Sequence, residues 1–274
     1  MTRLGRPRVS TVLVAALAVA WLYPVLWTFA NAFRSSADTY RPPWDLPLPP
    51  VLDNFGQAWD RGQLGAALAN SAYVTALTVA LVLVLAISAA YALTRLRPPG
   101  RAVLFALILA PLIIPTEVLI VPLFAMFRTL GLINSLPGVA LVNAVANVSF
   151  ATVILSGYFR TIPQDIIDAA RVDGAGRLDV LARIVMPVAR PGIVAVGLLV
   201  GVFTWNDFGG SLVLLQRPET FTVQLALAGF STFYSTDHGL TFAGMAIVIV
   251  PPLLLFLVLH RSLLGGLTAG AARR

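Results

Sequence analysis

Six long runs of apolar residues, separated by segments that carry arginine, constrain this chain more than any other feature. A helix needs about 20 apolar residues to cross the hydrocarbon core of a membrane. Each run is apolar on all sides, as is typical of a helix surrounded by lipid. With 58% hydrophobic and 11% charged residues, little of the chain remains for a soluble domain. The sequence predicts an all-α membrane protein with a single transmembrane domain over residues 1–274 and six spans: 9–33, 67–93, 102–124, 136–159, 193–215 and 240–264.

The first apolar run has two interpretations. Arg3, Arg6 and Arg8 precede it and the small residues Ala30 and Ala32 end it, as in a secretory signal. A signal core is typically about 7 to 15 residues long, and this run is longer. We therefore interpret it as the first membrane span.

The arginines give the expected orientation, because short loops rich in arginine stay on the cytoplasmic side. All 19 basic residues are arginine. With the amino terminus inside, 14 of the 19 are cytoplasmic and five are outside, namely Arg34, Arg41, Arg61, Arg128 and Arg217. We therefore expect both termini in the cytoplasm. The use of Arg alone, together with abundant Ala, Val and Leu, hints at a GC-rich bacterial genome.

Several classes of protein are disfavoured by what the sequence contains. The net charge of +7 comes from scattered arginines that form no stripe with aromatic residues, so nucleic acid is not an expected partner. There is no cysteine, and His238 and His260 lack the spacing of metal ligands. Without lysine the chain has no phosphate-binding Gly-x-x-x-x-Gly-Lys-Ser/Thr loop, and it has no hydrolase motif. We expect no catalytic site, metal or cofactor of its own.

Residues 161–187, between the fourth and fifth spans, are too polar to cross a membrane and carry their own helix signals. Thr161 and Gln164 form a capping-box pattern, and Pro163 suits a first helical turn. Gly174 permits a left-handed turn at the end of this helix. A second apolar face then runs to Pro187 through Leu178, Leu181, Ala182 and Val185. The segment is predicted to be a helical hairpin with a glycine corner.

The first helix of this hairpin places Ile166, Ala169, Ala170 and Asp173 on one face, at spacings of three and four. Short side chains let the backbone of a partner approach closely, so this face suits docking to another protein. The alternative is a surface hairpin that packs only on the spans of its own chain. The local residues leave both interpretations open.

The segment Asp168-Ala-Ala-Arg-Val-Asp-Gly-Ala-Gly176, followed by Ile184-Val-Met-Pro187, resembles the coupling motif of permeases in binding-protein-dependent ABC importers. Asp168 stands where that family usually has Glu, and Leu181 where it often has an aromatic residue. The resemblance implies the type I ABC importer permease architecture, in which the hairpin inserts into a cleft of a cytoplasmic ATPase. The residues that it assigns to coupling are Asp168, Ala169, Ala170, Arg171, Asp173, Gly174, Ala175, Gly176, Leu181 and Pro187.

Further segments resemble the carbohydrate branch of that family, of the maltose or multiple-sugar type, so that the likeness covers nearly the whole chain. In order they are Asn70-Ser-Ala-Tyr-Val-Thr75, Ser88-Ala-Ala-Tyr-Ala-Leu-Thr-Arg95, Gly131-Leu-Ile-Asn134, Phe203-Thr-Trp-Asn-Asp-Phe208 and Gly266-Leu-Thr-Ala-Gly270. The resemblance implies a multi-pass sugar permease of the bacterial plasma (inner) membrane. Its expected partners are a sister permease in a heterodimer, two ATP-binding-cassette subunits that use the ATP, and an extracytoplasmic sugar-binding protein. Pairing with a second copy and the identity of the sugar stay open.

Six polar or aromatic side chains in the apolar runs are candidates for the substrate path: Glu117, Asn143, Asn147, Trp205, Asn206 and Asp207. Ionisable groups inside a membrane are expensive and are functional candidates by default. The alternative for the carboxylates and asparagines is hydrogen bonding between helices. Trp205 could stack on a sugar ring, or it could anchor a span at the membrane interface.

Other functions of a polytopic membrane protein make different demands on the sequence. An ion-coupled secondary transporter is expected to show repeated spans and buried charge pairs near the midplane. A membrane enzyme needs polar catalytic groups clustered at one interface. Neither pattern is present, so a sugar permease is preferred. A permease for another solute and an ion-coupled transporter are the alternatives.

Overall fold

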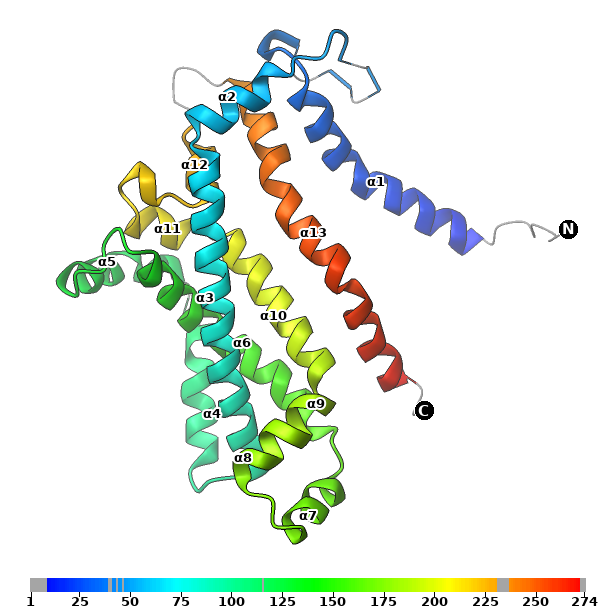
Figure 1. Ribbon diagram of the computed structural model, residues 1–274, viewed down its shortest axis with the longest axis vertical. Coiled ribbons are helices and arrows are strands. Elements are labelled where there is room, and N and C mark those ends of the chain that lie inside the picture. The colour runs from blue at the N-terminus through cyan, green and yellow to red at the C-terminus, as the bar shows by residue number, and fades with distance from the viewer. Residues whose placement is uncertain are drawn as a thin grey trace, which may run out of the picture. The chain divides into compact units, whose positions relative to one another are not determined.

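The computed structural model describes residues 9–38, 41–42, 44–45, 47–114, 116–230 and 237–271, and their side chains except at residues 9, 116–117 and 259–271. Every regular element in these ranges is helical (Figure 1). The single domain expected from the sequence divides into two compact units. The first unit is Met1–Gly65 with Ala226–Val250, and the second is Ala66–Leu225 with Pro251–Arg274.

Five long helices follow five of the expected spans. They are α1 (Val9–Ala32), α3 (Leu64–Tyr91), α6 (Leu136–Arg160), α10 (Arg190–Trp205) and α13 (His238–Ala271). By length and composition, four helices in the described ranges are able to cross a membrane: those at Ser10–Ala32, Leu64–Leu96, Leu136–Arg160 and His238–Val258. A fifth is added if α10 and the helical segment Arg177–Val188, which meet at a bend of 78°, are counted together.

Shorter helices connect the long ones. They are α2 (Asp53–Arg61), α4 (Arg101–Leu109), α5 (Ile120–Thr129), α7 (Gln164–Val172), α8 (Arg177–Val180), α9 (Met186–Val188), α11 (Gly209–Leu214) and α12 (Val223–Ala228). A π-helical turn, Ala92–Leu96, extends α3, and a second one, Leu181–Val185, joins α8 to α9.

The third expected span, residues 102–124, is not one helix. Its first half, α4, passes into a 3-10 turn at Ala110–Leu112, and the next α-helix, α5, begins only at Ile120. Pro111 lacks the N–H that would continue the α-helical ladder, which accounts for the change of geometry. The expected continuous helix is therefore corrected to two apolar helices with a break between them.

The fifth expected span, residues 193–215, is also shorter than predicted. The helix α10 starts earlier, at Arg190, and ends at Trp205, after which α11 is a separate short helix. The carboxylate of Asp207 accepts hydrogen bonds from the N–H groups of Gly210 (3.3 Å) and Ser211 (3.0 Å). Asp207 thus caps a new helix instead of lying within a continuous one.

The main core of the second unit lies where α3, α6 and α10 pack together. Small and β-branched side chains let these helices approach closely, as in other membrane helix bundles. A Cβ at Gly197 of α10 would stand 3.5 Å from Leu83 of α3. The fully buried side chains of this core include Val82, Ala86, Ala90, Ala151, Leu155, Phe159, Val196 and Val200.

A second cluster in the same unit joins the amino-terminal half of α3 to α5, α6 and α11. Hydrogen bonds hold residues 216–223, which follow α11, against the amino-terminal end of α3. Nδ2 of Asn70 donates to the carbonyl of Glu219 (3.0 Å), and the N–H of Val223 donates to the hydroxyl of Ser71 (2.9 Å). Oδ1 of Asn134 accepts from the N–H groups of residues 216 and 217. The helix α3 is therefore tied to other segments at this end.

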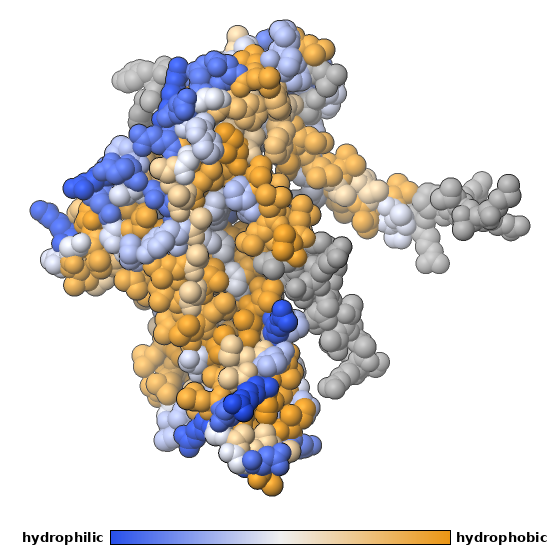
Figure 2. All heavy atoms as spheres, viewed as in Figure 1, coloured by the Kyte–Doolittle hydropathy of each residue, from blue (hydrophilic) through white to orange (hydrophobic). Residues whose placement is uncertain are grey.

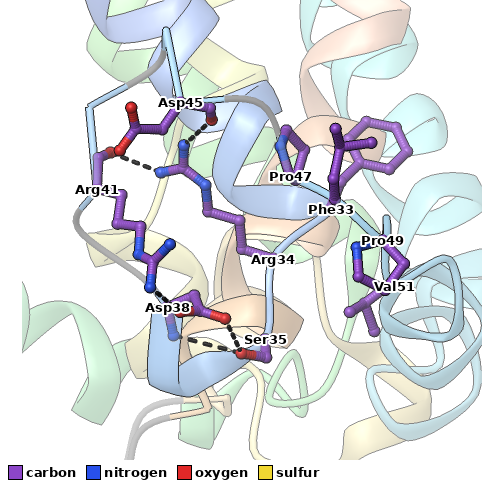
Figure 3. Close-up of a pocket in the computed structure, with 10 residues that line it drawn as sticks. Phe33, Arg34, Ser35, Asp38, Arg41, Asp45, Pro47, Pro49 and Val51 are labelled. Carbon is purple, nitrogen blue, oxygen red and sulfur yellow. Dashed lines mark hydrogen bonds and ion pairs between the residues drawn. The ribbon is translucent and has the colours of Figure 1, made fainter.

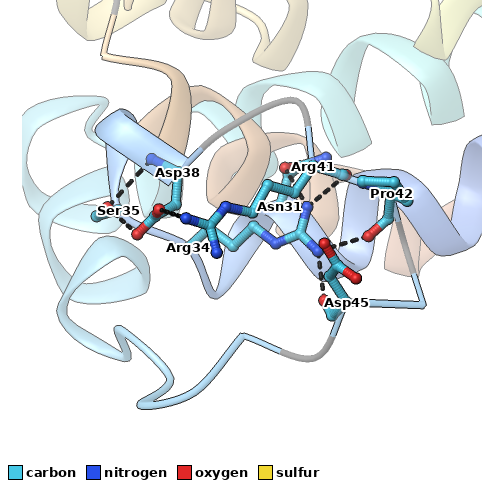
Figure 4. A network of polar contacts seen from close by, with 7 residues as sticks. All are labelled: Asn31, Arg34, Ser35, Asp38, Arg41, Pro42 and Asp45. Carbon is cyan, nitrogen blue, oxygen red and sulfur yellow. Dashed lines mark hydrogen bonds and ion pairs between the residues drawn. The ribbon is translucent and has the colours of Figure 1, made fainter.

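In the first unit, the loop that follows α1 is organised around Arg34, which is 4% exposed. Its guanidinium donates to Oδ1 of Asn31 (3.2 Å) and to the backbone carbonyls of Arg41, Pro42 and Asp45 (Figure 4). Several of these residues line a cavity of about 240 Å³ (Figure 3). Carbonyl oxygens satisfy this buried cation, and they fix the course of the proline-rich loop.

Candidate functional site

The first helix of the hairpin, α7, starts where the sequence places it, but by a different mechanism. The hydroxyl of Thr161 donates to the carbonyl of Tyr158 (2.8 Å) and so closes the end of α6 instead of capping α7. Pro163 occupies the N-cap position with an extended ψ of 137°, and no side chain caps the helix. The predicted capping box is therefore wrong. The side chain of Gln164 instead contacts α3, as described below.

The glycine corner has the predicted left-handed geometry. Gly174 has a φ of +87°, and nothing lies within 4 Å of the Cβ that another residue would add there. The N–H of Ala175 donates to the carbonyl of Ala170 (2.9 Å), and that of Gly174 donates to the carbonyl of Arg171 (3.1 Å). These two bonds form a Schellman motif. Backbone conformation alone therefore favours glycine at this position.

The face predicted on α7 divides between the interior and the surface. Ile167 is fully buried in the main core of the second unit, and Ala170 is half-buried against the same core. Ile166, Ala169 and Asp173 are exposed, Ile166 by 47%. We call these three residues the exposed hairpin face. Ala169 and Ala170, which the sequence assigns to one surface, thus have different surroundings.

The second limb of the hairpin, from α8 to α9, packs on the core through the predicted Leu181 and Val185, but not through the predicted Leu178 and Ala182, which are exposed. Val180 and Val185 are fully buried, and Leu181 is half-buried against the main core. Leu178 is 78% exposed, so its predicted place on the apolar face is corrected to Val180. The prediction assumed the regular spacing of an α-helix along this limb. The limb contains a π-helical turn, Leu181–Val185, which has one more residue per turn and so changes which side chains share a face.

Large apolar side chains stand unprotected near the corner of the hairpin. Val172 is 87% exposed and Leu178 is 78% exposed, next to the exposed hairpin face. Isolated surface leucines and valines are common, but several at one protruding corner are typical of an interaction site. Figure 2 shows hydrophilic and hydrophobic residues mixed on the surface at the end of the second unit where Figure 1 places α7 and α8.

The carboxyl end of α3 holds both limbs of the hairpin. Nη1 of Arg95 donates to Oε1 of Gln164 (2.9 Å), and Nη2 donates to the carbonyls of Ile162 (2.6 Å) and Phe159. The hydroxyl of Tyr91 donates to the carbonyl of Arg177 (2.9 Å) at the start of α8. Neither contact was expected from the sequence. Its only signal was that both residues belong to the segment 88–95, which carries the family resemblance.

Other residues assigned to the hairpin have local contacts. Asp168 pairs with Arg171 at 3.6 Å and accepts from Nε2 of Gln164 (3.0 Å). The N–H of Gly176 donates to Oδ2 of Asp179 (3.3 Å) at the start of α8. Pro187 lies in α9 and is exposed. Gly174 and Gly176 therefore act through the backbone, while Asp168 and Arg171 form a surface ion pair.

Two of the six path candidates meet in one cavity of about 180 Å³, which Asn143 and Asp207 line together with mostly apolar residues. Asp207 is committed to capping α11, where it also accepts from the hydroxyl of Ser211 (2.9 Å). Nδ2 of Asn143 donates to the carbonyl of Val139 (3.1 Å) within its own helix. Asn147 donates to the carbonyl of Asn143 (2.8 Å) in the same way. These hydrogen bonds run within one helix or cap the start of the next, and so they are not the bonds between helices that the alternative expected.

The remaining candidates lie elsewhere. Asn206 ends α10, and its Nδ2 donates to the carbonyl of Val202 (2.8 Å). Trp205 is 9% exposed and lines a separate apolar groove of about 690 Å³ between α3, α10 and residues 251–255 of α13. Its Nε1 is buried without a hydrogen-bond partner among the described residues. The side chain of Glu117 lies outside the described residues.

Comparison with known proteins identifies the family of this chain. Residues 61–265 match the model of the family described as "binding-protein-dependent transport system inner membrane component". A diacetylchitobiose uptake system permease protein of Streptomyces coelicolor is 31% identical over 94% of this chain and 87% of its own. A melibiose/raffinose/stachyose import permease protein of Bacillus subtilis is 30% identical over 97% of this chain and 96% of its own.

A solved structure has a closely similar fold. It is a chain in the crystal structure of a bacterial ABC transporter involved in the import of the acidic polysaccharide alginate, with a TM-score of 0.79 and 24% sequence identity. The alignment covers 92% of this chain and 94% of the other. Three observations point to the same family: the helical architecture of the described residues, the apolar helices, and the match over most of the chain. The chain belongs to the inner membrane components of binding-protein-dependent transport systems, and it is a multi-pass membrane permease.

Proposed function

We propose that this permease serves an importer of sugars, in which it forms half of the path across the plasma membrane and is driven through residues 161–187 by a separate cytoplasmic ATPase. The hairpin carries this proposal. Its glycine corner presents exposed apolar side chains and Ala169 to the outside. Its buried residues and its bonds to Tyr91 and Arg95 connect the same segment to the membrane helices. A partner that moves the hairpin therefore moves α3.

Sugars are the favoured substrate class because the relatives compared above are named for the uptake of di- and oligosaccharides. The segments between Asn70 and Gly270 that resemble the carbohydrate branch support the same choice. A permease for a different solute would share the hairpin and the fold, and it is the alternative. An uptake experiment with a panel of solutes separates the two.

The proposed function requires partner proteins that bind ATP, deliver the sugar and complete the path across the membrane. ATP is bound by two ATP-binding-cassette subunits, and this chain contributes no cofactor or catalytic group. An extracytoplasmic binding protein delivers the sugar. A sister permease supplies the other half of the path in a heterodimer. The apolar window of α1 supports such a neighbour or lipid around it, because none of that window is buried within the chain.

The test is reconstitution of the whole importer in proteoliposomes with its ATPase, its sister permease and its binding protein. We expect uptake of an oligosaccharide that requires ATP and every component. Purified alone, the chain should bind no nucleotide. Specific nucleotide binding by the isolated chain would contradict the assigned division of labour, and uptake of only non-sugar solutes would contradict the substrate class.

A further inference from the structure

Three arginines with no acidic partner line one cavity of the second unit. Arg97, Arg101 and Arg160 surround a volume of about 420 Å³ where the end of α3, the start of α4 and the end of α6 meet. The ion pairs among the described residues involve other arginines, namely Arg41, Arg171 and Arg183. No carboxylate lines the cavity. All three arginines are exposed, so water and salt screen part of their mutual repulsion, and an anion in the cavity would lower it further.

The cavity also has a buried hydroxyl that lacks a hydrogen-bond partner among the described residues. Ser156 is 5% exposed and lines the cavity, and its hydroxyl has no hydrogen-bond partner among the described residues. A buried hydroxyl in this state calls for a partner. The nine-residue helix α4 starts here after Gly100, which has no side chain to cap it, and its first turn has no acidic residue. The N–H groups of Arg101, Val103 and Leu104 already donate to the carbonyls of Pro98 and Gly100, so this helix start favours an anion mainly through its dipole.

Apolar surface continues from the cavity along α4. Leu93 and Phe105 line the cavity itself. Leu109, one turn after Phe105 on the same face of α4, is half-buried. A ligand that fits both parts has a negatively charged head and a hydrocarbon tail. An acidic peptide would match the arginines but would leave this apolar surface uncovered.

We infer that this basic pocket, formed by Arg97, Arg101, Ser156, Arg160 and the start of α4, binds the phosphate group of an anionic phospholipid. Basic pockets between membrane helices on the cytoplasmic side suit such head groups. The site lies beside the root of the hairpin, because Arg160 ends α6 and Arg97 is two residues from Arg95. The inference goes beyond the proposed function, since it holds for a permease of any solute.

Native mass spectrometry of the purified full chain tests the site, with phosphatidylglycerol and phosphatidylcholine of identical acyl chains as probes. We expect the wild type to retain phosphatidylglycerol preferentially. Changing Arg97, Arg101 and Arg160 to Gln together should weaken this binding by about fivefold for each arginine removed. Ser156→Ala should weaken it by about threefold. Arg101→Gln alone changes an exposed residue, so it keeps the test valid if the triple variant fails to fold.

Matched controls separate the site from general charge effects. Changing Arg61, Arg128 and Arg217 to Gln removes the same charge elsewhere and should leave phosphatidylglycerol binding unchanged. Inorganic phosphate at millimolar concentration should not displace the lipid, and full displacement would overturn the lipid assignment in favour of a free-anion site. Equal phosphatidylglycerol binding by the wild type and the Arg101→Gln variant would overturn the proposal.

Discussion

The guanidinium of Arg95 donates a hydrogen bond of 2.9 Å to Oε1 of Gln164, which joins the end of α3 to the first residue of α7. Tyr91, one helical turn earlier, donates to the carbonyl of Arg177 at the start of α8. One helix thus holds both limbs of the hairpin. At its other end α3 is bonded to residues 219–223. A displacement of the hairpin can reach the opposite end of the bundle through a single helix of 28 residues.

Replacing Arg95 should uncouple the hairpin from α3. A hydrogen bond to a charged group contributes about 1.5 to 3 kcal/mol, so Arg95→Gln weakens the attachment of Gln164, Ile162 and Phe159 together. We expect sugar uptake by the reconstituted importer to fall about tenfold while the ATPase still co-purifies. Arg128→Gln, which removes an exposed arginine from α5, is the control and should keep uptake.

A double-mutant cycle measures whether this contact carries the coupling. Arg95→Ala and Gln164→Ala should be non-additive by about 1 kcal/mol in thermal stability, because each removes the same hydrogen bond. Strict additivity would show that the two side chains do not interact in the membrane-embedded protein.

Glycine is required at position 174 for its backbone conformation and not for lack of space, since a Cβ there would meet nothing within 4 Å. A residue with a side chain resists the φ of +87°, so Gly174→Ala should cost about 1 kcal/mol locally. Gly174→Asp should reduce uptake and ATPase co-purification more than protein abundance. The control is Gly56→Ala in α2, where a Cβ also meets nothing and φ is not positive. Wild-type uptake and co-purification for Gly174→Asp would remove the hairpin from the coupling mechanism.

The neighbouring alanines Ala169 and Ala170 should respond differently to the same change. Ala169 is on the exposed hairpin face, so Ala169→Trp should block the approach of the ATPase and leave abundance unchanged. Ala170 packs against the main core, so Ala170→Trp should overpack it by about 1 to 3 kcal/mol and lower abundance. Asp168→Glu keeps the surface charge and should be mild. Immunoblots measure protein abundance, and co-purification measures ATPase binding. Identical results for the two Trp variants would contradict the different surroundings of Ala169 and Ala170.

The sequence predicted the uninterrupted long helices and the left-handed glycine turn. It failed at the helix breaks near Pro111 and Trp205, at the capping box of α7, and where distant residues decide the structure. The bounds of α6 and the left-handed turn at Gly174 follow from apolar run length and from glycine at a helix end. That Ala169 is exposed while Ala170 is half-buried depends on how α7 packs against the core. The hydrogen bonds of Arg95 to Gln164 and Ile162 join residues 69 and 67 positions apart, and no local sequence pattern predicts them.

Orientation in the membrane is the prediction that depends most directly on the arginines. Reporter fusions after Gly62 and after Arg97 flank the helix α3 and should label opposite sides of the membrane, with Arg97 on the cytoplasmic side. The expected position of Arg97 comes from the 14-to-five distribution of arginines. Labelling of both sites from the same side would contradict this topology and would also move the basic pocket to the wrong leaflet.

Asp207 has two competing roles, in the substrate path and in the cap of α11. Its carboxylate accepts from the N–H groups of Gly210 and Ser211 and from the hydroxyl of Ser211. It also lines the small cavity that contains Asn143. The cap explains why an acidic residue is present there, because a carboxylate is favourable at a helix start.

If capping is the role of Asp207, then Asp207→Ala should lower stability by about 1 kcal/mol, and Asp207→Ser, which retains a capping oxygen, should recover most of it. Neither change should alter the order in which a panel of sugars is transported. Asn143→Leu, in the same cavity, tests the path directly, since it removes a polar group that caps nothing. Thermal unfolding in detergent and competition uptake measure the two properties separately. A changed order of sugars in Asp207→Ser, at unchanged stability, would assign the carboxylate to the substrate path instead.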